Sequence, residues 1–222
     1  MIKLNIGAGP NMFPFDGWIN YDREDFAGWL KWIEVTTFAD YLQNIANYVR
    51  GGGKVVSIQQ DLRDNFPQHK DNSTDLIYCG QAIEHLNYVY EIPKFLKECF
   101  RMLKSGGVLR MTTPDLDLLL NAYLSGEMNK FAIEQPEIYK SLDPSAQLAM
   151  LMYGASGENC KWDHYEGHFF LYTQKSMTKV LNDAGFGNIQ FYYEKSKSHS
   201  SVMAKECVDM GMTHSFIVEA VK

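Results

Sequence analysis

The sequence predicts an α/β protein whose sheet is mostly parallel and has an antiparallel edge. Three observations support this fold class. Short runs rich in β-branched and aromatic residues alternate with other segments in the first half of the chain. Glycine, proline or polar residues follow directly on these runs, as they do where strands end in turns. The last two strand-like runs have no crossover helix between them, which favours an antiparallel hairpin.

The composition is that of an ordinary globular protein. The chain has 222 residues, enough for one large domain or one domain with an insertion. Hydrophobic residues make up 45% and charged residues 22%, which excludes a disordered, collagen-like or coiled-coil chain. The 21 basic and 27 acidic residues give a net charge of −6, so the chain is a poor general binder of nucleic-acid phosphates. Aromatic residues reach 14%, enough to shape a pocket or an interface as well as a core.

The cysteine pattern and the N-terminus favour a reduced, soluble, cytoplasmic protein. The four cysteines form no Cys-x-x-Cys pair and fit neither a zinc site nor a dense disulfide scaffold. The N-terminus enters a strand pattern directly, without the basic and apolar regions of a signal peptide. No apolar run approaches the ~18 residues of a membrane span, so we expect no membrane partner.

Five runs in the first half of the chain predict strands of a parallel sheet, because they are short and largely β-branched or aromatic. They are Lys3–Ile6, Trp18–Tyr21, Lys54–Ile58, Asp75–Cys79 and Gly107–Thr112. The segment Tyr88–Leu103 predicts a helix, since its apolar residues recur at steps of three, one, three, one and three. The segment Phe26–Val49 also has a helical pattern, and we interpret it as an insertion at about residues 26–50 with a candidate homodimer surface.

The pattern changes after Asp115. Leu116–Leu124 and Gln174–Ala184 predict helices, and residues from about 126 to 165 are expected to be irregular, with proline and glycine as punctuation. Ile189–Glu194 and Ser215–Val221 predict the strands of the terminal hairpin. We expect one domain, 1–222, with the helical insertion and a lid-like insertion at about residues 126–172.

Small and acidic residues follow the first three strands, at the edge where α/β sheets bind ligands. Gly7-Ala8-Gly9 ends the first strand, Asp22 the second, and Asp61-Leu62 follows the third. Glycines permit close approach of a ligand, and carboxylates accept hydrogen bonds from ribose hydroxyls or an adenine amino group. Taken singly, the glycines are explained by a tight turn and each aspartate by a position in a turn. The order of glycines, acid and acid after successive strands is more specific evidence for a ligand site. The dinucleotide fingerprint needs a further glycine where Met12 stands.

This order of motifs resembles the class I S-adenosylmethionine-dependent methyltransferases, in particular small-molecule members of the type 11 kind. The resemblance spans nearly the whole chain, and its more specific blocks are Ala82–Leu86 and Leu103–Gly107. It implies a Rossmann-like, seven-stranded, mostly parallel sheet with an antiparallel C-terminal strand, and S-adenosylmethionine as the cofactor. The cofactor-binding residues that it implies are Asn5, Gly7, Ala8, Gly9, Asp22, Asp61, Leu62, Gly80 and Gln81.

Two departures from the family pattern affect the cofactor pocket. The family often has an acidic residue where this chain has Asn5, which hydrogen-bonds but adds no charge to a methionyl ammonium contact. The last glycine of the longer glycine pattern is replaced by Asn11, and about ten residues separate Gly9 from Ile19. We therefore expect the usual first helix to be absent or one turn long, and the pocket to be more open there.

Candidate general bases near the cleft are Glu84, His85, Asp115, His164 and His168. Glu84 and His85 are adjacent, so we expect that they do not both face the cleft from one helix. We predict His85 and His168 as the catalytic residues; packing in the loop after the fourth strand is the alternative for His85. The four-residue spacing from His164 to His168 would align two metal ligands on a helix. Gly167 argues against that helix, so we predict a substrate-loop histidine and no metal.

The leading hypothesis is a methyltransferase that acts on a small-molecule oxygen or nitrogen acceptor by in-line transfer. An NAD-linked oxidoreductase on a similar sheet is a second hypothesis, and Met12 counts against it. A cofactor-binding protein that serves as a non-catalytic interaction module is a third. A nucleic-acid or protein acceptor is disfavoured, because the chain has no basic run and no Asn-Pro-Pro-Tyr-like tetrad after the fourth strand.

Overall fold

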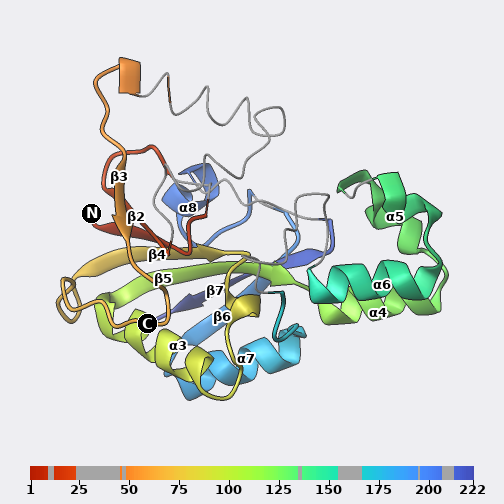
Figure 1. The fold of residues 1–222 in the computed structure, drawn as a ribbon. Helices are drawn as coiled ribbons and strands as arrows, with labels where there is room; N and C mark the ends of the chain where they lie inside the picture. Colours follow the sequence, from red (N-terminus) through yellow and green to blue (C-terminus); the bar gives the residue numbers. More distant parts are fainter. Residues whose placement is uncertain are drawn as a thin grey trace.

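A seven-stranded sheet forms the centre of the protein in the computed structural model (Figure 1). The structure describes residues 1–9, 13–23, 46, 49–134, 137–154, 167–194, 196–206 and 213–222. The strands lie in the order β3-β2-β1-β4-β5-β7-β6. Their bounds are β1 Lys3–Ile6, β2 Trp18–Asp22, β3 Val56–Gln59, β4 Thr74–Gly80, β5 Leu103–Pro114, β6 Gly187–Tyr192 and β7 Ser215–Val221.

The strand directions confirm the predicted fold class. β1 pairs in parallel with β2 and β4, β2 with β3, and β4 with β5. β7 runs antiparallel to both of its neighbours, β5 and β6. The sheet is therefore Rossmann-like and mostly parallel, with an antiparallel C-terminal strand. The carboxyl ends of β1, β2, β3 and β4 meet at one edge of the sheet, and the predicted cofactor-binding residues other than Asn5 lie at or after these strand ends.

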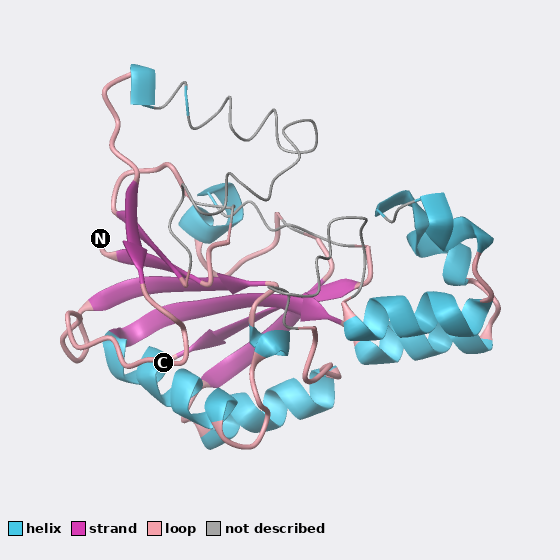
Figure 2. Cartoon of the chain, viewed as in Figure 1, coloured by secondary structure: helices cyan, strands magenta, loops and turns pink. Residues whose placement is uncertain are grey.

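The helices α3 (Glu91–Met102) and α7 (Gln174–Asp183) cover one face of the sheet, and the short helix α8 (Ser201–Glu206) lies on the opposite face (Figure 2). α3 buries the predicted apolar stripe, and α7 packs beside it. α3 begins three residues later than the pattern indicates. On the opposite face, α8 buries Met203 against Phe13 and Trp18. Glu206 at the end of α8 accepts hydrogen bonds from Lys3 and from the Trp18 indole, which holds α8 to β1 and β2.

The expectation of an irregular segment from about residue 126 is wrong for residues 128–134, 137–141 and 144–153. The chain there forms η2 (Met128–Glu134), α5 (Glu137–Ser141) and α6 (Pro144–Tyr153), which pack with α4 (Leu116–Leu124). Pro144 is not a breaker but the first residue of α6, where its missing N–H costs nothing. The Asp143 carboxylate caps this helix by accepting hydrogen bonds from the next two free amides.

α4, η2, α5 and α6 form a helical lobe, residues 116–134 and 137–154, with a small core of its own (Figure 1). Leu119, Phe131, Tyr139 and Leu151 are among its buried residues. Because α4 follows β5 directly, the lobe stands beside the carboxyl ends of the parallel strands. The predicted insertion at about 26–50 lies outside the described residues, apart from residues 46, 49 and 50.

The antiparallel pairing of β6 and β7 is confirmed. The expectation that no helix lies between these strands is wrong, because their connection contains the short helix α8. A six-residue helix shows too little of a helical stripe to be recognised in the sequence.

Within the described residues, no helix is long and apolar enough to cross a membrane. Cys79 and Cys99 are buried free thiols, and burial raises the pKa of both.

A buried ion pair joins β5 to β7. Arg110 and Glu219 lie opposite each other in the antiparallel register, and both side chains are 0% exposed. The distance from Arg110 Nη1 to Glu219 Oε1 is 2.7 Å. Arg110 also donates to the Lys197 carbonyl, while Glu219 accepts from the Ser198 hydroxyl and from the His199 amide. The charges are thus compensated inside the protein, and the β6–β7 connection is fixed to the sheet.

We expect acidification to destabilise the protein through His214. This side chain is 2% exposed and rests against Phe131; its Nδ1 has no hydrogen-bond partner in the described part of the chain. Burial lowers its pKa to about 4 from the ordinary 6.5. The unfolded chain therefore takes up the proton first, and stability present above about pH 6.5 is lost as the pH falls toward about 4. Between about pH 7.5 and pH 5 the loss from His214 is on the order of 2 kcal/mol.

Urea unfolding at the two pH values measures this loss. His168 is half-buried and also has a lowered pKa, so the test compares the natural chain with His214→Phe. Phenylalanine keeps the aromatic packing and has no group to protonate. The variant should lose less stability than the natural chain on acidification. Equal losses in the two proteins would show that His214 does not contribute.

Candidate cofactor and acceptor site

The glycine loop after β1 packs tightly on one side and is open on the other. Gly7 and Gly9 both have positive φ angles, of 69° and 53°. A Cβ on Gly7 would lie 2.7 Å from the Ala82 Cβ, so only glycine lets the loop rest against the segment after β4. A Cβ on Gly9 would meet no atom within 4 Å. Gly9 therefore leaves open space at the edge of the sheet, into which a ligand can come close to the backbone.

Asp22, at the end of β2, is bound to the glycine loop. Its Oδ2 accepts a hydrogen bond of 2.7 Å from the Gly9 amide, and the Ala8 amide donates to the Tyr21 carbonyl. Each carboxylate oxygen has more than one lone pair, so Asp22 retains the capacity to accept a ribose hydroxyl. The loop and Asp22 thus form one unit, and its donors and acceptors fit the adenosyl part of S-adenosylmethionine.

Asn5 lies inside the sheet, behind the glycine loop. Its side-chain amide donates a hydrogen bond of 2.9 Å to Asn20, which also accepts from the Phe13 amide. These bonds join β1 and β2 to the end of the first connection. The sequence predicts that the helix between β1 and β2 is absent or one turn long. Residues 10–12 of this connection lie outside the described residues, and residues 13–17 form no helix.

Asp61 and Leu62, the predicted adenine contacts, follow β3. Asp61 accepts hydrogen bonds from the amide and the guanidinium of Arg63, at 2.8 and 3.1 Å. Leu62 packs against the main core beside Gly7. The Arg63 guanidinium also forms a salt bridge with Glu91 on α3 and donates a hydrogen bond to the His85 carbonyl. The predicted adenine contacts are therefore linked, through Arg63, to the segment that follows β4.

Gly80 and Gln81 form a constrained turn at the end of β4. A Cβ on Gly80 would collide with the Tyr78 hydroxyl. Gln81 has a φ of 51°, an unfavourable conformation for a residue other than glycine, with a cost of about 1–3 kcal/mol. Its amide donates to the Thr112 carbonyl and its side chain to Ser215, which hold the turn in place. Such strain is typical of residues positioned for function.

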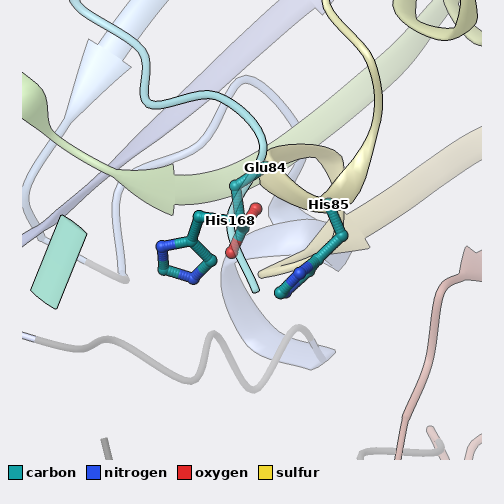
Figure 3. Close-up of side chains that lie close together, drawn as sticks. All are labelled: Glu84, His85 and His168. Carbon is teal, nitrogen blue, oxygen red and sulfur yellow. The ribbon is translucent and has the colours of Figure 1, made fainter. Parts of the chain in front are cut away.

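Three side chains from two distant segments converge just beyond this turn (Figure 3). Glu84 and His85 belong to η1 (Ile83–His85), and His168 to the segment before α7. One potential ligand atom of each lies within 4.8 Å of the other two. The sequence leads us to expect that Glu84 and His85 do not both face the cleft from one helix, but in the structure one potential ligand atom of each lies close to the other. The segment is a single 3₁₀ turn rather than an α-helix, and His168 arrives from a different part of the chain.

Burial sets the protonation states in this cluster. Burial raises the pKa of Glu84 to about 8, although a hydrogen bond from the Thr113 hydroxyl opposes the shift. Burial, together with the neighbouring His85, lowers the pKa of His168 to about 4. Both groups are therefore mostly uncharged near pH 7 when no cation is present. Perturbed titrations of this kind are concentrated at functional sites.

The other candidate bases stand differently. Asp115 is buried, caps α4 through the amides of Asp117 and Leu118, and accepts a hydrogen bond from Tyr193. These bonds give it a structural role. His164 lies outside the described residues. The sequence did not indicate Gly154, which packs against His168, or Thr113; only their contacts in the folded chain identify them.

A hollow of about 240 Å³ is lined by Arg63, Asn87, Glu91 and Phe169. Two of these residues bind the backbone of the cluster, since Arg63 donates to the His85 carbonyl and the Phe169 amide to the Glu84 carbonyl. Asn87 lies two residues after His85, and Phe169 follows His168 directly. The hollow is open to solvent and carries both a guanidinium and a carboxylate. It offers space for a small polar molecule beside the three converging side chains.

Residues 28–111 match the family model described as "Methyltransferase domain". Over 100 residues the chain is 34% identical to an mRNA cap guanine-N(7) methyltransferase of Caenorhabditis elegans; the match covers 44% of this chain and 26% of that protein. Over 97 residues it is 32% identical to a probable S-adenosylmethionine-dependent methyltransferase of Mycolicibacterium smegmatis, covering 40% and 36% of the two chains. The matches thus span about a third or less of these relatives' lengths.

The fold is also found in solved methyltransferase structures. An S-adenosylmethionine-dependent methyltransferase from Thermotoga maritima, described as a possible histamine N-methyltransferase, has a TM-score of 0.51 at 16% identity. That comparison covers 100% of this chain and 81% of the other. A putative O-methyltransferase from Nostoc punctiforme has a TM-score of 0.52 at 14% identity, over 100% and 52% of the chains. The motifs, the match over residues 28–111 and the fold are thus all similar to those of S-adenosylmethionine-dependent methyltransferases.

Proposed function

We propose that this protein transfers the methyl group of S-adenosylmethionine to an oxygen or nitrogen of a small molecule. The observation that carries the proposal is the bond between Asp22 and the Gly9 amide, beside open space at Gly9. This unit stands next to the cluster of Glu84, His85 and His168, because Gly7 rests on Ala82. A site for the adenosyl part and a site for an acceptor are thus adjacent.

The chain's own residues contribute mainly by alignment. S-adenosylmethionine supplies an activated methyl group on a sulfonium, whose leaving thioether is neutral and needs no acid. Gly7, Gly9 and Asp22 would hold the adenosyl part, and Gly80 and Gln81 lie on the methionine side. Alignment of donor and acceptor is worth up to ~7–11 kcal/mol in favourable cases. For a hydroxyl acceptor, the cluster around His85 and His168 assists removal of the proton.

The predicted lid belongs to this proposal. The helical lobe contacts His168, since the Met152 carbonyl faces its Nδ1 and Gly154 lies against its ring. The lobe therefore forms one wall of the acceptor site. The aromatic residues Trp162 and Tyr165, which the sequence suggests as part of the lid, lie outside the described residues.

Thermal unfolding with added ligands tests the proposal. S-adenosylmethionine and S-adenosylhomocysteine should raise the midpoint, because a ligand that binds only the folded chain stabilises it by mass action. NAD should not, and stabilisation by NAD alone would overturn the proposal in favour of an oxidoreductase. Mass spectrometry of reactions with hydroxyl, amine and guanine-cap acceptors then identifies the acceptor class. The cap compound is included because of the match to the guanine-N(7) enzyme.

A further inference from the structure

Glu84, His85 and His168 have the composition of a metal-binding triad. Two imidazoles and one carboxylate suit divalent transition metals, and three protein ligands leave coordination positions open for other molecules. The three potential ligand atoms lie within 4.8 Å of one another, and Figure 3 shows the carboxylate of Glu84 between the two rings. Ligands of a tetrahedral ion at ~2.1 Å are about 3.4 Å apart, so the atoms need to close by at most about 1.4 Å.

Both histidines are oriented as metal ligands usually are. His85 Nδ1 faces the Gly167 carbonyl at 3.4 Å, and His168 Nδ1 faces the Met152 carbonyl at 3.1 Å. For His168, a carbonyl at this position favours the hydrogen on Nδ1, so that Nε2 is the atom that can bind an ion. A Cβ on Gly154 would lie 2.6–2.9 Å from three atoms of the His168 ring, so Gly154 packs on the ring face and not at its Nε2 edge.

Glu84 ties the two segments together. Its main-chain carbonyl accepts hydrogen bonds from the amides of Phe169 and Phe170, at 2.8 and 3.2 Å. Its side chain is 1% exposed, and its Oε2 accepts a 3.2 Å hydrogen bond from the Thr113 hydroxyl. The described structure shows no ion pair to this carboxyl. Burial of a carboxylate is costly unless a positive charge compensates it, and a bound cation would supply that charge.

We propose that Glu84, His85 and His168 bind one divalent transition-metal ion, which in turn holds an oxygen of the methyl acceptor. This reverses the expectation from the sequence that the protein has no metal site. The spacing of His164 and His168 misled that expectation, because the partners of His168 lie more than eighty residues earlier in the chain. The metal site stands on the three side chains, whereas the acceptor's part in it rests on the proposed function.

The ion gives the acceptor site a defined chemistry. A hydroxyl bound to a divalent cation releases its proton to water more readily than a free hydroxyl does. An oxygen lone pair then forms the bond to the methyl carbon, while the carbon–sulfur bond breaks and its electron pair stays on sulfur. The neighbouring hollow of about 240 Å³ has room for the rest of the acceptor. The acceptor class is therefore a small molecule that offers a hydroxyl as a metal ligand.

Metal binding can be measured without any turnover. The chelator-treated protein is titrated with Co²⁺, followed by visible absorption, and with Zn²⁺, followed by calorimetry. We expect one ion per chain. Glu84→Gln keeps the shape of the side chain and removes its charge, and His85→Ala removes a half-buried ring; each should weaken binding at least tenfold. His199→Ala, which changes a histidine on the β6–β7 connection, is the matched control and should bind as the natural chain does.

The affinity for S-adenosylhomocysteine separates this inference from the proposed function. The two ligand variants should bind S-adenosylhomocysteine as the natural chain does, which also shows that they are folded. The metal site is refuted if the natural chain takes up neither ion, or if both variants bind metal with unchanged affinity. If metal binds as expected but S-adenosylhomocysteine does not, the proposed function fails and the metal site remains.

Discussion

Replacing Asp22 with alanine is expected to weaken S-adenosylhomocysteine binding by about 100-fold or more. A hydrogen bond to a charged group contributes about 1.5–3 kcal/mol, and a ribose presents two hydroxyls to this carboxylate. A 100-fold change corresponds to about 2.7 kcal/mol, so even incomplete loss of the two bonds reaches it. The substitution also removes the acceptor of the Gly9 amide and so loosens the glycine loop. Isothermal titration calorimetry measures the effect directly.

Two matched variants make the Asp22 result specific. Asp22→Asn keeps an oxygen for the Gly9 amide but removes the charge, so its affinity should lie between those of the alanine variant and the natural chain. Asp16→Ala changes an exposed aspartate on the connection between β1 and β2 and should leave the affinity unchanged. If Asp22→Ala binds the cofactor product as tightly as the natural chain, the glycine loop and Asp22 do not form the cofactor site.

Replacing Arg110 with methionine is expected to lower the free energy of unfolding by about 3–5 kcal/mol. The substitution leaves Glu219 buried without its cation; both side chains are 0% exposed in the natural chain. Removal of one partner of a buried pair is costly because the remaining charge has no compensation. Urea unfolding at neutral pH, followed by circular dichroism, provides the measurement. A loss below about 1 kcal/mol would contradict this view of the pair.

The double variant Arg110→Met with Glu219→Leu tests whether the uncompensated charge of Glu219 causes the loss of stability in Arg110→Met. An apolar pair of similar volume often restores the stability lost when one charge is removed. Here we expect only partial recovery, because the Ser198 hydroxyl and the His199 amide also lose their acceptor on Glu219. Full recovery would mean that those two groups find other partners. The single Glu219→Leu variant completes the thermodynamic cycle.

The sheet could be predicted from the sequence because its signals are local. Each strand run is followed by residues that stop strands, and the apolar stripe of α3 has a regular period. α6 is hard to predict because its apolar residues are spread around the helix rather than along one stripe, and because Pro144 suggests a break. α8 was missed because six residues show too little of a period.

The candidate site also has a part that local sequence patterns predict and a part that they do not. Gly7, Gly9 and Asp22 follow strands, and the topology of a parallel sheet brings strand ends together, so their proximity followed from local patterns. The meeting of His168 with Glu84 and His85 did not, since it depends on the amides of Phe169 and Phe170 binding the Glu84 carbonyl. No spacing in the sequence encodes a contact between segments this far apart.

Because the helical lobe has a core of its own, it is a candidate for a unit that opens cooperatively while the rest of the protein stays folded. A small core that shares few residues with the main one can open at a lower free energy than the whole molecule. His168 touches this lobe at Met152 and Gly154. Any molecule that fixes His168 therefore favours the closed lobe by linkage, and the amides of α6 would exchange their hydrogens more slowly in its presence. Under the proposed function, binding of the acceptor would therefore also favour closure of the lobe.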